Sequence, residues 1–214
     1  MKKPLQVFET FDLWQPEQSD LAEFTKFVLR IYYEHHLHTP APIDEVNACI
    51  KEDLALFPNG HFYTLKTKEG EIFGTIGVSL WDGKAKLAIE QEYDLDITHE
   101  IKTRGLNPPQ VWNIRRFATD RQMIKQRSEL RPFHALYFKL LLTCVFHHIC
   151  AYPNNAMVAE CDCKLQRTLI SLGISSEELS KPHFVLGSQA VPIFNTGAGL
   201  QEFYDNHKHL LNHV

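Results

Sequence analysis

Basic side chains are concentrated in one short stretch of this sequence. They are opposed there only by Asp120 and Glu129, and they comprise Arg115, Arg116, Arg121, Lys125, Arg127 and Arg131. The stretch begins with the strand-like run QVWNIRRFATD and ends at Pro132, a residue type favoured at the first position of a helix. A strand, a cation-rich loop and a helix N-terminus together suit an anionic group such as a phosphate, because free backbone N–H groups and the helix dipole converge there. The alternative is a solvated, charge-rich loop.

Candidates for this anion site are Arg121, Lys125, Arg127 and Arg131, with His134 in the first turn of the helix. Two further residues are candidates for proton transfer, Glu160 on a predicted strand and Tyr137 on the helix after Pro132. A glutamate can accept a proton through water, and a tyrosine can protonate a leaving group. For Tyr137 the alternative is core packing with the hydroxyl at the edge.

Composition narrows the class of protein. The chain has 214 residues, of which 44% are hydrophobic and 22% charged, so we expect one domain spanning residues 1–214. The net charge of −4 gives little support to nucleic-acid binding. The sequence lacks a signal-peptide pattern and an apolar run of membrane-spanning length, so we expect a cytoplasmic protein. Five irregularly spaced cysteines suit reduced thiols, and the twelve histidines complete no recognised zinc spacing, so no bound metal is predicted.

The elements that must position these residues alternate between helix and strand patterns. Strand patterns occur at residues 5–13, 110–120 and 156–162, and HFYTLKTK and EIFGTIGVSLW form a predicted hairpin. Helices are predicted after Ser19 or Asp20, over residues 44–56, from Pro132 to about Pro153, over residues 164–173, and from about Leu200. Residues 183–194 indicate a last strand or hairpin. Residues 82–109 show no clean period and are predicted to be a variable insertion whose acids face substrate or water.

The motif V-W-N-I-R-R-F-A at residues 111–118 resembles V-W-E-[IL]-[ST]-R-F-[AC] of the acyl-homoserine-lactone synthases and long-chain N-acyl amino acid synthases, which are GNAT-superfamily acyltransferases. G-E-I-F-G-T-I-G-V at residues 70–78 is similar to the G-x-[IL]-x-G-T-x-R-[VL] of these families. LQRTLISLG and VPIFNT resemble their later helix and closing strand, so the resemblance covers nearly the whole chain.

This resemblance implies an α/β (α+β) fold of the GNAT type. Its mixed, mostly antiparallel twisted sheet is flanked by helices, and the fourth and fifth strands splay apart around the acyl-pantetheine arm of the donor. Phe117, Ala118 and Thr119 would then lie along the donor, together with the basic residues above. No tightly bound cofactor is implied, because acyl-CoA or acyl-phosphopantetheine serves as the donor substrate. The partners would be an acyl carrier protein or coenzyme A thioester and a small amine acceptor.

The positions at which this sequence matches the synthase motifs, and those at which it departs from them, together define the expected chemistry. Arg116 is retained and is the expected catalytic arginine, buried enough to need a carboxylate or carbonyl partner. Arg30, Trp112 and Asn113 are the expected acceptor-binding residues. Asn113 replaces the Glu of the synthases and cannot act as a base, and Gly77 replaces their Arg, so S-adenosylmethionine is not the expected acceptor.

The sequence therefore predicts an N-acyltransferase that moves an acyl group from a thioester to a small amine, such as an amino acid. The alternative is a non-catalytic acyl-carrier or acyl-ligand binding protein that kept the fold. The replacements at Asn113 and Gly77 leave this alternative open.

Overall fold

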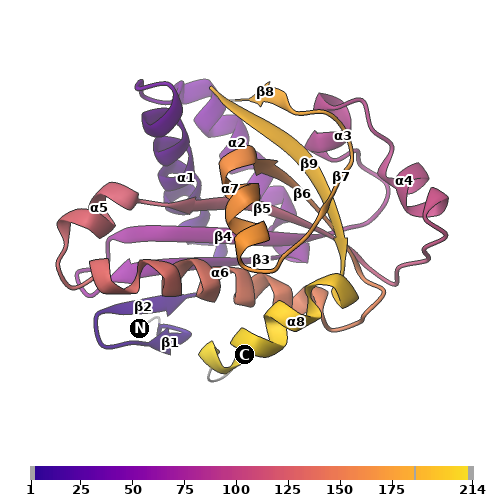
Figure 1. Ribbon diagram of the computed structural model, residues 1–214. Coiled ribbons are helices and arrows are strands. Elements are labelled where there is room, and N and C mark those ends of the chain that lie inside the picture. The colour runs from indigo at the N-terminus through magenta and orange to yellow at the C-terminus, as the bar shows by residue number, and fades with distance from the viewer. Residues whose placement is uncertain (1–2, 186, 212–214) are drawn as a thin grey trace.

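A nine-stranded sheet forms the centre of the computed structural model, which describes residues 3–185 and 187–211 (Figure 1). The strands follow the order β1-β2-β3-β4-β5-β6-β9-β7, with β8 paired to β9. Their bounds are β1 Gln6–Val7, β2 Phe11–Trp14, β3 Gly60–Thr67, β4 Ile72–Trp81, β5 Val111–Thr119, β6 Ala156–Asp162, β7 Glu177–Glu178, β8 His183–Val185 and β9 Ser188–Thr196. Strands β5 and β6 are parallel, and the other described pairs are antiparallel. The predicted mixed, mostly antiparallel sheet is confirmed.

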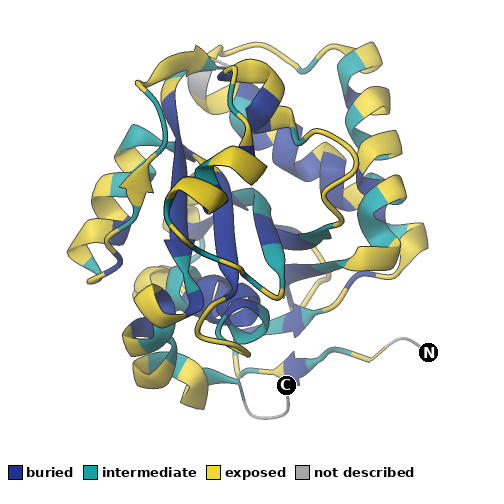
Figure 2. Cartoon of the chain, turned by 90° about the vertical axis from the view of Figure 1, so that its right-hand side faces the viewer, coloured by how far each residue is buried: buried dark blue, intermediate teal, exposed yellow. Residues whose placement is uncertain are grey.

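Helices cover both faces of this sheet. Their bounds are α1 Leu21–His36, α2 Ile43–Leu56, α3 Ala88–Glu92, α4 Ile97–Thr103, α5 Arg121–Gln126, α6 His134–Ile149, α7 Cys163–Ser171 and α8 Gly197–His207. Helices α6 and α8 share the largest apolar cluster with one face, whereas α1 and the α3–α4 segment pack on the other. The strands are accordingly buried and the outer helix surfaces exposed (Figure 2).

Helix α6 shows how local sequence and burial agree. Nine of its residues are buried, including Leu140, Leu141 and Phe146, so this helix is apolar around most of its circumference. A 3-10 turn containing Pro132 precedes its first residue, His134. Helix α6 therefore packs against one face of the sheet beneath β3, β4 and β5, and its side chains contact the centre of that face.

Three regions differ from the sequence-based prediction. Residues 82–109 contain helices α3 and α4, whose apolar side chains pack on β6 and β9. The predicted loop after β5 begins with α5, because the Asp120 side chain accepts a hydrogen bond from Met123 N at 2.8 Å and caps the helix. The predicted first strand is a short hairpin, with Phe8 N donating to Phe11 O between β1 and β2.

None of the helices in the described ranges combines the length and apolar character needed to cross a bilayer.

Candidate active site

The fork between β5 and β6 is the defining feature of the site. Residues 111–114 of β5 pair with residues 156–159 of β6, and the pairing stops at Ile114 and Ala159. Beyond that point β5 contains a bulge, because the segment from Arg115 to Ala118 opposes only Gly77 to Thr75 of β4. Arg116 occupies the extra position with φ of 57°. The two parallel strands therefore separate and leave backbone groups facing each other without strand pairing.

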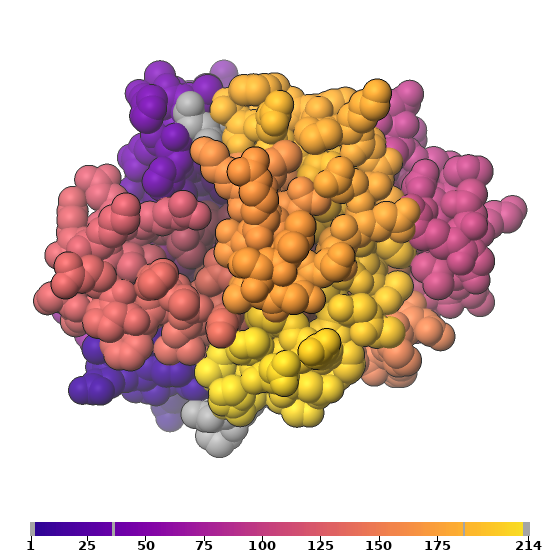
Figure 3. Space-filling model, viewed as in Figure 1, coloured from indigo at the N-terminus to yellow at the C-terminus, as the bar shows by residue number. Residues whose placement is uncertain are grey.

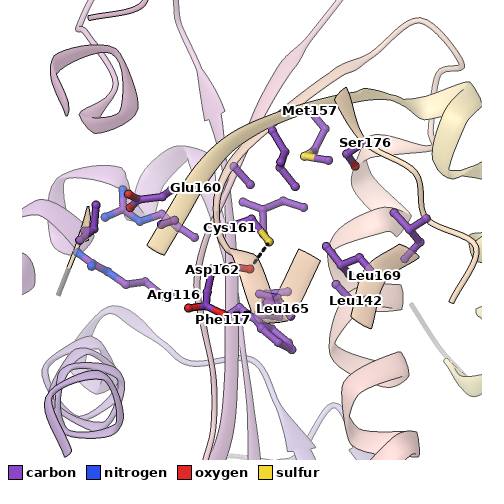
Figure 4. Close-up of a pocket in the computed structure, with 18 of the residues that line it drawn as sticks. Arg116, Phe117, Leu142, Met157, Glu160, Cys161, Asp162, Leu165, Leu169 and Ser176 are labelled. Atoms are coloured by element: carbon purple, nitrogen blue, oxygen red, sulfur yellow. Dashed lines mark hydrogen bonds between the residues drawn. The ribbon is translucent and has the colours of Figure 1, made fainter. Parts of the chain in front are cut away.

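A cavity of about 160 Å³ fills this fork. One end is polar and contains Tyr32, Arg115, Arg116 and Glu160, whereas the other end is apolar. Figure 4 shows Arg116 and Glu160 at one side and Leu142 and Leu169 at the other, with the strands between them. The arrangement places charged groups next to a slot that accepts an apolar chain.

The bulge puts two consecutive arginines against the same pair of acids from α2. Arg115 Nη2 lies 2.8 Å from Glu52 Oε2 and 3.0 Å from Asp53 Oδ1. Arg116 Nη2 lies 2.8 Å from Glu52 Oε2, and its Nε lies 3.1 Å from Asp53 Oδ1. The side chains of Arg115, Arg116 and Asp53 are 10%, 13% and 0% exposed. Arg116 therefore has the carboxylate partner that the sequence predicted, and its supplier is Asp53.

Opposite charges in this group stabilise the ionised forms of Glu52 and Arg116. Burial favours the neutral form of Glu52, but Arg115 and Arg116 outweigh it and lower the Glu52 pKa. Burial also opposes the charge on Arg116, but Asp53, Cys49, Glu52 and Tyr32 together outweigh it and raise the Arg116 pKa. Asp53 further accepts a 2.6 Å hydrogen bond from Thr25 Oγ1 of α1. We call Arg115, Arg116, Glu52 and Asp53 the charge tetrad.

A second group of acids lies at the polar end of the cavity, which we call its mouth: Glu160 lines the cavity, and Glu92 contacts Glu160. The Tyr93 hydroxyl donates to Glu160 Oε1 at 2.8 Å, and Glu92 forms a side-chain hydrogen bond with Glu160. The Tyr93 ring stacks on His183 with centroids 4.7 Å apart. Burial, followed by the charge and hydrogen bond of Glu160, raises the pKa of Glu92 to about 7. Glu92, beside the fork, can thus accept a proton near neutral pH.

The fork continues into a second cavity of about 210 Å³ between α1, α5 and α7. It shares Tyr32, Phe117, Asp162 and Leu165 with the first cavity. Figure 3 shows this hollow between the α5 segment (salmon) and α7 (orange). We call this second cavity the α5–α7 groove.

Two cations line the α5–α7 groove, Arg121 at the start of α5 and Lys164 in the first turn of α7. Neither forms an ion pair with another residue that the structure describes. Phe117, Ala118 and Thr119 line the same groove, so the structure brings these predicted donor residues together with Arg121. Lys164 was not among the predicted residues.

The remaining predicted cations do not line either cavity. Arg127 forms ion pairs with Glu69 and Glu71 at the β3–β4 turn, so its charge is already used to hold the hairpin. Lys125, Arg131 and His134 are exposed, and within the described part of the chain they take part in no ion pair. The basic residues predicted to form one anion site therefore do not lie together. Arg121 lines the α5–α7 groove, whereas Arg127 binds the acids of the β3–β4 hairpin.

Arg30 does not line either cavity and instead forms ion pairs, one of which connects two elements of the fold. Its Nη2 lies 3.0 Å from Asp120 Oδ2, and its Nη1 lies 3.1 Å from Glu34 Oε2. Asp120 also caps α5. Arg30 thus ties α1 to the corner at which β5 ends and the groove begins.

Neither Tyr137, a proton-transfer candidate, nor Trp112, an expected acceptor-binding residue, is among the residues that line the two cavities. Tyr137 is fully buried beneath β2 and β4, where its ring packs against Phe11 and Phe73 and its hydroxyl donates to Leu130 O at 2.9 Å. Trp112 belongs to the paired part of β5 and lies near His148 on the α6 side, with ring centroids 5.7 Å apart. Strand alternation directs it to the face opposite Asn113.

Asn113 and Gly77 occupy the positions of the two departures from the synthase motifs. Asn113 is 8% exposed and also lies in the paired part of β5, outside the residues that line the two cavities. A Cβ on Gly77 would lie 3.0 Å from Phe62 Cδ1 and 3.5 Å from Arg115 Cγ. Phe62 and Arg115 therefore fill the space that a larger side chain at this position needs.

Sequence reasoning missed Glu52, Asp53, Glu92 and Lys164. Glu52 and Asp53 lie on α2, more than sixty residues from their arginines, so no local pattern links them. Glu92 lies in the predicted insertion at residues 82–109, whose acids were expected to face substrate or water. The acidic composition of this segment was therefore a signal that could have identified Glu92 as a site residue. Within the described residues, no group of three or more His, Cys, Asp or Glu side chains is placed to hold a metal ion.

No protein-family model matches this sequence, and no curated protein matches it. Solved structures do match. FeeM, an N-acyl amino acid synthase from uncultured soil microbes, has a TM-score of 0.61 and 17% identity over 93% of this chain and 97% of its own. A Desulfovibrio desulfuricans protein assigned to the GNAT family of acetyltransferases has a TM-score of 0.53 and 13% identity, over 88% of this chain and 99% of its own. The fold is that of the GNAT acyltransferases. The AHL synthase LasI has the same fold, with a TM-score of 0.54 and 13% identity over 89% of this chain and 92% of its own.

Proposed function

We propose that this chain is an N-acyltransferase that uses a fatty acyl thioester as donor and a small amine as acceptor. The observation that carries the proposal is the fork cavity, which joins a polar end at Arg116 and Glu160 to an apolar end at Leu142 and Leu169. A thioester carbonyl placed between these ends has its acyl chain in the apolar part and its reacting carbon near the acids. Two proteins that share the fold support the proposal: FeeM is an N-acyl amino acid synthase, and LasI is an AHL synthase.

The α5–α7 groove is the proposed site of the donor's phosphopantetheine arm. It opens directly from the fork, and Arg121 and Lys164 supply two cations for a phosphate. The unpaired edges of β5 and β6 offer hydrogen bonds to the amides of the arm. A phosphate on coenzyme A and one on an acyl carrier protein have the same chemistry, so both donors are included in the proposal.

The exposed cations Lys125 and Arg131, together with the exposed His134, extend a basic surface beyond the groove. Such a rim attracts an acidic partner by long-range electrostatics. We propose it as the docking surface for an acidic acyl carrier protein. A carrier-bound donor should then show a steeper loss of kcat/KM with added salt than the coenzyme A thioester of the same acyl chain.

The reaction needs few groups. An amine attacks the thioester carbon, the new C–N bond forms, and the C–S bond breaks to release a thiol. Glu160, held by Tyr93, is the proposed acceptor of the amine's proton, and Glu92 shares this role. Arg116 is proposed to shape and charge the polar end of the cavity through its contacts with Asp53 and Glu52.

Amine-dependent thiol release tests the proposal. Purified protein is mixed with decanoyl and acetyl thioesters of coenzyme A and a panel of amines, with donor alone as the blank. Ala159 lines the fork, so Ala159→Phe should fill it and reduce use of the decanoyl donor at least about tenfold while sparing the acetyl donor. Ala198→Phe, on the exposed surface of α8, is the matched control. Donor binding without amine-dependent thiol release would instead support the non-catalytic alternative.

A further inference from the structure

At the polar end of the fork cavity, acidic side chains outnumber basic side chains. Among the described residues that line this cavity the basic ones are Arg115 and Arg116, and each is already paired with Glu52 and Asp53. The charge tetrad is therefore neutral as a unit. The acids at the mouth, Glu92 and Glu160, form no ion pair with the described residues.

A tyrosine hydroxyl holds Glu160 in place. Tyr93 donates its hydroxyl to Glu160 at 2.8 Å, and its ring stacks on His183. Tyr32 also lines the cavity, and its hydroxyl donates a hydrogen bond to Phe117 O at 3.0 Å. Burial raises the Tyr32 pKa to about 12, so this phenol adds no charge of its own near neutral pH. The net negative charge at the mouth therefore has no internal counterion in the described structure.

A carboxylate on the acceptor would meet two obstacles at this mouth. It would lie next to Glu92 and Glu160, and like charges at close range repel. It would also find the charges of Arg115 and Arg116 already balanced by Glu52 and Asp53, with the buried Arg115 Nε left as an N–H that has no partner among the described residues. A positively charged acceptor meets neither obstacle and neutralises the acids.

We infer that the acceptor is a primary amine that arrives as an ammonium ion and carries no carboxylate. This inference rests on the proposed function and narrows its acceptor class, excluding the free amino acids that the sequence alone suggested. The cavity mouth selects against the second charge of an amino acid, while the fork still binds the acyl donor.

The proton balance follows from the same residues. The ammonium ion gives one proton to Glu160, which frees the nitrogen lone pair for attack on the thioester carbon. The C–N bond forms, the C–S bond breaks, and the second nitrogen proton leaves to the departing thiolate. Glu160 then returns its proton to water. The products are an amide and a thiol, with one proton released.

Matched acceptor pairs that differ only in a carboxylate test the inference. The pairs are tyramine with tyrosine and cadaverine with lysine, each assayed with decanoyl-CoA in the parent, Glu160→Gln, Glu92→Gln and the surface control Glu202→Gln. We expect the decarboxylated member to have at least about tenfold higher kcat/KM in the parent, which is about 1.4 kcal/mol of discrimination. This ratio should fall in Glu160→Gln and Glu92→Gln and stay constant in Glu202→Gln.

The ratio separates selection from catalysis. Loss of a proton acceptor slows both members of a pair together, so it leaves the ratio unchanged, whereas loss of a selecting charge changes it. An equal or reversed preference in the parent, or an unchanged ratio in both mouth variants, would overturn the inference and leave the N-acyltransferase proposal intact. Thiol release with none of the amines would overturn the proposed function itself.

Discussion

Asp53 is the residue on which the geometry of the charge tetrad most depends, and its removal gives the sharpest stability prediction. It is completely buried and accepts bonds from Arg115, Arg116 and Thr25. Asp53→Asn keeps the shape but leaves one excess positive charge on two arginines that are 10% and 13% exposed. Leaving a buried charge uncompensated costs about 3–5 kcal/mol, so we expect a loss of that size in the free energy of unfolding.

Glu52 supplies the matched control, because it contacts the same two arginines at 2.8 Å but is 43% exposed. Water screens an exposed carboxylate, so Glu52→Gln should cost about 1 kcal/mol or less. The double variant Asp53→Leu with Arg116→Met removes one charge of each sign and should recover most of the loss of the single variant.

Urea unfolding followed by tryptophan fluorescence measures these differences as shifts in the midpoint at a constant m-value. Equal losses in Asp53→Asn and Glu52→Gln would show that burial does not set the strength of these contacts. A loss below about 1 kcal/mol in Asp53→Asn would refute the view that the tetrad is a buried, balanced unit.

Further predictions concern the donor, the mouth and the α6 end of the core. Arg121→Glu should weaken donor binding by about 2 kcal/mol in calorimetric titration with acyl-CoA, whereas Arg127→Ala should leave donor affinity unchanged, because Arg127 serves the hairpin acids. The kcat/KM for a cationic amine should rise as Glu92, with its pKa of about 7 beside Glu160, ionises, and Glu92→Gln should remove this rise from the pH profile. Burial, followed by two neighbouring histidines, lowers the pKa of His148 to about 3. The pKa of His148 in the folded state lies below its unfolded value of about 6.5. The contribution of His148 to the free energy of unfolding is therefore complete above about pH 6.5 and falls as the pH is lowered, by about 2 kcal/mol at pH 5. His148→Gln should flatten this dependence in urea midpoints measured at several pH values, and an unchanged slope would contradict it.

Strong local patterns allowed the centre of the fold to be predicted. The β3–β4 hairpin has a turn at Gly70 between two apolar strands, and α6 is a long apolar run. Each signal is contained within one element, so it does not require knowledge of distant contacts. The fork itself was expected only through the family resemblance, and the structure shows it at Ile114 and Ala159.

Short elements were harder to predict. Helices α3 and α4 contain 5 and 7 residues and are separated by Asp94, whose φ is 51°. Their buried residues Ile89, Tyr93, Ile97 and Ile101 are spaced by four, so a signal was present. It was obscured by the acids between them, and most of the stability of such short helices comes from packing on the sheet.

The site combines local and distant contributions, and only the local part is visible in the sequence. Arg116 and Glu160 were found on strand motifs, because the strands themselves carry them. Asp53 was missed because its pairing depends on how α2 packs beside β5. Tyr137 was misplaced because a helix apolar on most sides gives no indication of which face meets the cleft.

A crystal structure with a non-hydrolysable acyl-CoA thioether tests the central claim most directly. We predict that the acyl chain lies in the fork against Leu142 and Leu169, with the thioether near Glu160 and a phosphate between Arg121 and Lys164. Ligand density outside the fork, with β5 and β6 enclosing only solvent or protein side chains, would contradict the assignment of this cavity as the acyl-donor site.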